Sequence, residues 1–182
     1  PLKEIGLRLL PIALPERYDV SPIAALLDDK ELREPARAAL ELAGTEPARA
    51  ALRDALSKTD PEFQYALLNS LAVLQDAESL STVESYLRHS DARVRAAAAR
   101  AVAWTGDPGF LTAVKRVFAD ADPATRRDAG EALIRLADAM MRKGGKWEIA
   151  MSVYRELLAS DAEVSVKNAA LAGLGRFGDE TA

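Results

Sequence analysis

The stretch GLGRFGD at residues 173–179 contains three glycines, Gly173, Gly175 and Gly178, spaced as G-x-G-x-x-G. This is the spacing of the turn that holds the pyrophosphate of a dinucleotide. Such a turn needs a strand before the glycines, a helix after them, and an acidic residue about 20 positions further on. Here a helical pattern precedes the glycines, and the sequence ends at Ala182. We therefore interpret the glycines as packing and helix-end residues and predict no bound cofactor.

The ionisable side chains that are spaced for catalysis or metal binding all lie near expected helix ends. Asp28 and Asp29, and likewise Asp120 and Asp122, place two carboxylates together, as acid–base catalysis or Ca²⁺ binding requires. Capping of free helix N–H groups explains these aspartates better. His89, the only histidine, stands near the end of a helical stretch, where the helix dipole favours a cation. Because the chain has no cysteine and His89 has no visible partner cluster, we predict no catalytic residue and no metal ligand.

The composition describes a chain that can fold but that has no overall attraction for nucleic acid. Of its 182 residues 49% are hydrophobic, enough for a sizeable core, and only 5% are aromatic, which favours closely packed helices over a β-sandwich. The net charge is −4. No apolar run is long enough for a membrane span, and no signal peptide is visible. The compartment stays open between the cytoplasm and export from a bacterial cell.

A repeat of 31 residues organises the chain. The segment DARVRAAAARAVAWTGD (91–107) aligns with DPATRRDAGEALIRLAD (122–138), and steps of 31 back reach 60–76 and 29–45. Aspartate opens each of these four segments, and Asp-Pro or Glu-Pro pairs recur at the turns, as expected where helices begin. Apolar residues spaced by three and four precede each segment. We therefore predict units of helix A, turn, helix B, turn, with the periodic aspartates at helix starts.

The expected units form a single array over 1–182. Residues 1–13 form a partial repeat, which suggests a fragment of a longer bacterial protein. The further units are predicted at 21–44, 45–75, 76–106, 107–142 and 145–178. In this alignment Gly173 falls in a column of small residues, where a neighbouring helix packs closely, and Gly178 falls at a helix end. The arginine column of the repeat is interrupted by Gln64, which should break any ladder of Asp–Arg pairs there.

The last interval is longer, because ten residues around MMRKGGKWEI are inserted and the offset becomes 41. The stretch 133–158 resembles a TPR hairpin, with Gly145 at the turn, Ala150 at the close contact and Tyr154 four residues later. We predict one helix that runs to about residue 142 and a second helix over about 146–159.

The repeat as a whole resembles the bacterial HEAT-like type, carried by the aspartate, the Val-Arg pair, the alanine run and the closing Gly-Asp of 91–107. The resemblance implies an all-α fold, a right-handed α-solenoid of stacked antiparallel helix pairs in an ARM-type superhelix. It also implies that the B helices line the concave face, where function would sit.

Three columns of B-helix positions are expected to be exposed, the first being Glu34, Tyr65, Ala96, Arg127 and Asn168. Aromatic and arginine side chains in such columns are the types that interface hot spots favour. The candidate partner-binding residues are Tyr65, Asn69, Arg100, Trp104, Arg127, Glu131 and Arg135.

We expect a non-enzymatic scaffold that binds a protein, a peptide or another domain of its parent chain; the oligomeric state stays open, with a monomer favoured. One alternative is a subunit of a HEAT-like enzyme of the lyase or DNA-repair glycosylase type, for which Glu131 would be the groove acid. Another is a binder of the nucleic-acid backbone, through the basic strip RHSDARVRAAAAR; the acidic total and Asp91 within the strip count against it.

Overall fold

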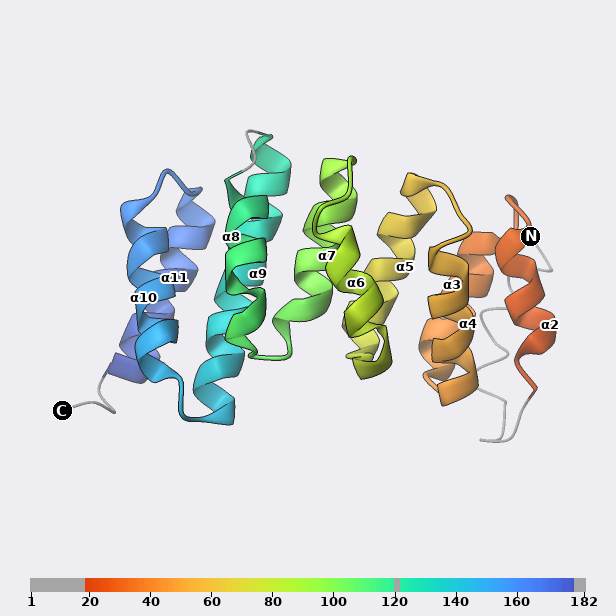
Figure 1. Ribbon diagram of the computed structural model, residues 1–182, viewed down its shortest axis with the longest axis horizontal. Coiled ribbons are helices and arrows are strands. Elements are labelled where there is room, and N and C mark those ends of the chain that lie inside the picture. Colours follow the sequence, from red (N-terminus) through yellow and green to blue (C-terminus); the bar gives the residue numbers. More distant parts are fainter. Residues whose placement is uncertain (1–18, 120–121, 179–182) are drawn as a thin grey trace. The chain divides into compact units, whose positions relative to one another are not determined.

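The computed structural model describes residues 19–119 and 122–178, and the predicted partial repeat at 1–13 lies outside them. Every regular element in the described residues is helical (Figure 1), as the sequence predicts. None of these helices is both long and apolar enough to cross a bilayer. The chain divides into two compact units, Pro1–Ser79 and Leu80–Ala182, and each is described by itself.

In the first unit, short helical segments flank three longer helices that pack against one another. Its elements are α2 (Ser21–Ala24), the 3₁₀ helix η1 (Ala25–Asp28), α3 (Arg33–Ala43), α4 (Glu46–Leu56), α5 (Pro61–Leu74) and η2 (Ala77–Ser79). Gly44 ends α3 with φ +59°, a left-handed conformation that glycine adopts without strain. The core is apolar and fully buried, with Leu40, Leu52 and Phe63 at 0% exposure.

The second unit contains three helix pairs, in each of which a shorter helix is followed by a longer one. Its elements are α6 (Leu80–Tyr86), α7 (Ala92–Ala103), η3 (Pro108–Phe110), α8 (Leu111–Phe118), α9 (Pro123–Lys143), α10 (Trp147–Ala159) and α11 (Val164–Gly178). Within this unit α7 packs against α9, and α9 packs against α11, while α8 and α10 lie against α9. These are the stacked helix pairs of an α-solenoid, and the right-handed sense stays a prediction.

Aspartate caps explain where three of the B helices begin. The side chain of Asp60 accepts a hydrogen bond from Phe63 N, that of Asp91 from Arg93 N, and that of Asp122 from Thr125 N. The prediction is wrong for Asp29, which accepts from Glu31 N in a turn and does not cap α3. The three residues after Asp29 continue that turn, so the helix begins only at Arg33.

An arginine early in a B helix reaches the aspartate near the start of the next B helix. Arg33 Nη1 lies 2.5 Å from Asp60 Oδ2 in the first unit, and Arg126 Nη1 lies 2.5 Å from Asp161 Oδ2 in the second. Gln64 stands in the same column and instead donates to the carbonyl of Leu56 at 3.3 Å. An amide forms no ion pair, as the sequence predicts for this position.

The ten inserted residues lengthen one helix and form a tight turn. Helix α9 has 21 residues against 12 in α7, and α10 follows after a turn in which Gly144 and Gly145 both have φ near +80°. The predicted long helix and its successor are therefore confirmed.

The small-residue prediction for Gly173 is also confirmed. A Cβ at this position would lie 2.7 Å from the Tyr154 ring, so α11 approaches α10 too closely for any side chain there.

Candidate functional site

The candidate site of the second unit is the face formed by α7 and α9, which carries five of the seven predicted residues. Arg100 of α7 joins the two helices, because its Nη2 lies 3.2 Å from Asp128 Oδ2 of α9. Arg127 and Arg135 of α9 are both exposed, the side chain of Arg127 by 46%. Glu131 lies between them in the sequence and is half-buried. The structure therefore brings Arg127, Glu131 and Arg135 together on one helix with Arg100 beside them.

Trp104 is the aromatic member of this face, and it ends α7. The Nζ of Lys143 lies 5.1 Å from the centre of its ring and donates to the carbonyl of Thr105 at 2.8 Å. The indole N–H is buried and has no acceptor among the described residues. Since the side chain is half-buried, part of Trp104 packs between the ends of α7 and α9, and only part of it faces outward.

Asp138 is a second connected carboxylate of α9, besides Asp128, and neither was among the predicted residues. Its Oδ1 accepts a hydrogen bond from the Tyr154 hydroxyl at 2.5 Å, and its Oδ2 lies 3.8 Å from Arg176 Nη1. Burial first, and then the hydrogen bond and charge of Asp138, raise the pKa of Tyr154 well above its usual value. The phenol therefore stays protonated and holds α10 to α9, which makes it a structural donor and no general base. The sequence offers one indication of Asp138, because it is the last residue of its repeat segment, as Asp76 and Asp107 are of theirs.

The expected exposure of Ala96 is wrong, because this residue is only 1% exposed. The reason is that α7 carries four consecutive alanines, 96–99, each at most 1% exposed. Their small side chains let other helices approach closely on more than one side, and both α6 and α9 pack against α7. The middle of α7 is therefore covered, and its more open side chains lie towards its two ends, at Arg93 and Arg95 and at Arg100 and Trp104.

The remaining two predicted residues, Tyr65 and Asn69, lie on α5 in the first unit and are half-buried. The side-chain amide of Asn69 donates to the carbonyl of Tyr65 at 3.0 Å. Neither side chain is as open as Arg127 or Arg135.

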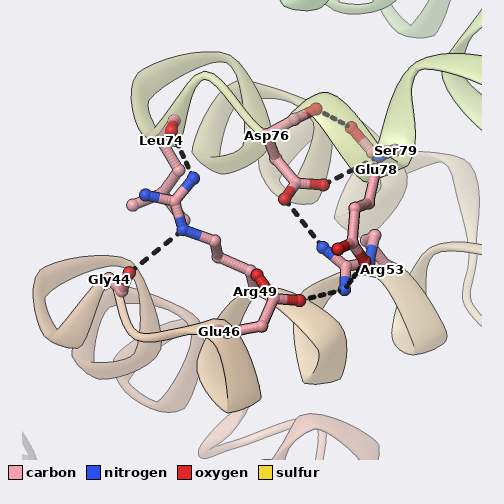
Figure 2. A network of polar contacts seen from close by, with 8 residues as sticks. All are labelled: Gly44, Glu46, Arg49, Arg53, Leu74, Asp76, Glu78 and Ser79. Carbon is pink, nitrogen blue, oxygen red and sulfur yellow. Dashed lines mark hydrogen bonds and ion pairs between the residues drawn. The ribbon is translucent and has the colours of Figure 1, made fainter. Parts of the chain in front are cut away.

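A polar network in the first unit was also missed by sequence reasoning (Figure 2). Arg49 of α4 donates to the carbonyls of Gly44 and Leu74, at 3.0 and 2.6 Å, which lie at the ends of α3 and α5. Arg53, one turn later, contacts the carboxylates of Asp76, Glu46 and Glu78 at 2.5–2.9 Å. Since lone arginines on a helix A carry no distinguishing pattern, nothing in the sequence indicated this network.

The network ties α4 to the helices on either side of it. Asp76 is only 2% exposed, and its second oxygen accepts from the N–H of Ser79. Both arginines use their donors on atoms of the unit itself (Figure 2), so the arrangement stabilises the fold and offers no open site for a ligand.

Comparisons with known proteins agree with this geometry. Residues 49–134 match the family described as HEAT repeats. The crystal structure of an engineered protein is similar in fold, with a TM-score of 0.50 and 21% identity over 97% of this chain and 90% of that one. No curated protein matches the chain. The likeness to the engineered protein shows the fold alone.

Proposed function

Because the chain contains HEAT repeats in an α-solenoid fold, we propose that it is a non-enzymatic scaffold that binds a protein or peptide partner. The proposed binding face in the second unit is the α7–α9 face, with Arg100, Trp104, Arg127, Glu131 and Arg135 as contacts. Solenoid repeats commonly use extended surfaces of this kind for protein recognition. Tyr65 and Asn69 are a separate proposal for the first unit.

The observation that carries the proposal is the exposure of Arg127 and Arg135 on the α7–α9 face, which also carries the half-buried Trp104. The two arginines lie eight residues apart on α9, so both project from one side of the helix. Arginine and tryptophan side chains dominate the binding energy of many interfaces. The neighbouring Asp138 and Tyr154 are engaged with each other, so the polar groups of this face suit recognition better than proton transfer.

A differential pull-down tests the proposal. Arg127→Glu with Arg135→Glu reverses two charges on the face, and Arg116→Glu with Arg155→Glu makes the same charge change at exposed positions of α8 and α10. Proteins recovered from an extract of the native cell by the wild-type chain should fall at least tenfold with the first pair and stay constant with the second. Equal recovery with both pairs, or equal loss, would remove the face from the proposal.

A second pair of substitutions tests the α7 side. Arg100→Ala with Trp104→Ala should also lower recovery, while the circular dichroism at 222 nm stays that of the wild type. Full recovery by this variant would restrict the proposed face to α9.

A further inference from the structure

Arg135 and Arg142 of α9 and Arg176 of α11 lie around Asp138, in the second half of α9 and the last turn of α11. Arg135, Asp138 and Arg142 follow at intervals of three and four residues, so they lie on one side of α9. Arg176 extends from α11 to within 3.8 Å of Asp138. In Figure 1 the ends of α9 and α11 lie at the same edge of this unit. We name these three arginines the arginine cluster.

Asp138 does not neutralise the arginine cluster. It carries one negative charge against three positive ones, and its Oδ2 lies at the outer limit of ion-pair distance from Arg176. Arg135 and Arg142 are exposed, and neither forms an ion pair with any residue that the structure describes. Among the residues that the structure describes, positive charge therefore exceeds negative charge around Asp138, although the chain as a whole has a net charge of −4.

The charge is also unevenly divided along the sequence. Residues 1–79 contain nine basic and fourteen acidic side chains, whereas residues 80–182 contain fifteen basic and fourteen acidic ones. The positive excess of the second part thus stands out against an acidic first part.

Helix dipoles account for only part of the cluster. The carboxyl end of a helix favours a cation in its last turn, and Arg142 and Arg176 occupy such positions. Arg135 lies two turns before the end of α9, beyond the reach of this effect. Lys143 is a further cation in the last turn of α9, and its Nζ donates to the carbonyl of Thr105.

From this excess of positive charge we infer that the partner segment bound at this edge is an acidic peptide, whose carboxylates are held by Arg135, Arg142 and Arg176. The inference rests on the proposed function, because it names the chemistry of the partner. Guanidinium groups bind carboxylates through paired, charge-assisted hydrogen bonds. A peptide can space its carboxylates to meet the arginines and leave uncharged residues opposite Asp138.

The same face is poorly suited to a nucleic acid. Both signs of charge are interspersed along α9, where Arg127, Glu131, Arg135, Asp138 and Arg142 follow at intervals of three or four residues. A phosphate backbone carries negative charge at every nucleotide, so it would face the carboxylates of Glu131 and Asp138 as well as the arginines.

Fluorescence anisotropy with a labelled peptide of four glutamates separated by single alanines tests the inference, and a peptide with glutamines in their place is the control ligand. Arg142→Gln with Arg176→Gln should weaken binding of the glutamate peptide at least tenfold at 50 mM salt. Arg116→Gln with Arg155→Gln removes the same charge from α8 and α10 and should leave the affinity within twofold. The glutamine peptide should not bind.

Three results would overturn the inference. These are equal binding of the two peptides, equal weakening by the two variant pairs, and tighter binding of a 12-nucleotide single strand that depends on the same arginines. If the inference fails while Arg127→Glu with Arg135→Glu still releases a native partner, the proposed function stands with a partner of other chemistry. If the glutamate peptide binds as expected but no native partner is released, the proposed function fails by itself.

Discussion

Gly173→Ala is the substitution whose effect follows most directly from the structure. A Cβ at this position would lie 2.7 Å from both Cε1 and Cζ of Tyr154. The Tyr154 ring is fully buried, and its hydroxyl is bonded to Asp138 at 2.5 Å, so the ring cannot move away without disturbing that bond. The strain must therefore be taken up by a shift of α11 or by loss of the hydrogen bond.

Opposing contributions set the size of the effect. Alanine favours a helix over glycine by about 1 kcal/mol. Overpacking a core costs about 1–3 kcal/mol, and a lost hydrogen bond to a charged group costs about 1.5–3 kcal/mol. We expect a net destabilisation of about 2 kcal/mol. Gly175 lies in the same helix with no atom within 4 Å of its Cβ position, so Gly175→Ala should stabilise by about 0.5–1 kcal/mol.

Urea unfolding followed by tryptophan fluorescence measures both variants, because Trp104 and Trp147, the only two tryptophans, lie in the second unit. The midpoint should fall for Gly173→Ala and rise for Gly175→Ala. Tyr154→Leu in the Gly173→Ala background should cost less than Tyr154→Leu alone, since a smaller side chain makes room for the new methyl group. If both alanine variants raise the midpoint alike, the close packing of α10 on α11 is refuted.

Two further predictions concern the core and the caps. Ala98→Glu places a charge where the wild-type side chain is 0% exposed, so it should destabilise the second unit by about 3 kcal/mol or more. Ala172→Glu, at an exposed position, should not destabilise it. An unchanged melting temperature for Ala98→Glu would contradict the tight contact. The hydrogen bond from Arg33 lowers the pKa of Asp60 in the folded chain. The Asp60 carboxylate therefore adds stability above its unfolded pKa of about 3.9, and this gain is lost as the pH falls towards the folded pKa. Urea midpoints by circular dichroism should show Asp60→Asn less stable than wild type at pH 7, and the difference should shrink as the pH is lowered below about 3.9. A constant difference on acidification would rule out the ionic contribution.

The periodic features of the sequence predicted the fold well. A 31-residue spacing of aspartates and apolar residues was enough to predict the helix pairs, because each B helix buries the same face against the next pair. The insertion of ten residues, which lengthens one repeat offset to 41, likewise indicated the long α9. Asp29 failed as a helix cap because the local turn that follows it competes with the helix, and periodicity does not report such competition.

The candidate site was less predictable, since a helical column indicates a face but not what lies against it. Ala96 belongs to an outward column by spacing, yet the alanine run of α7 lets neighbouring helices cover it. Asp138 became recognisable only when Tyr154 and Arg176, 16 and 38 positions further along the chain, were seen beside it. Contacts between side chains so far apart depend on how much each helix pair rotates against the next, and the sequence alone does not specify that rotation.

The pairs Arg33–Asp60 and Arg126–Asp161 each join two successive copies of the repeat. A copy that carried both the aspartate and the arginine in these roles would supply an anion to the copy before it and a cation to the copy after it. A gene duplication that inserts one whole copy would bring both charges with it, so the new junctions would regain their partners without compensating changes. Arrays of this type can thus grow or shrink by recombination in steps of one copy, while an insertion of half a copy would leave a charge without its partner at each junction.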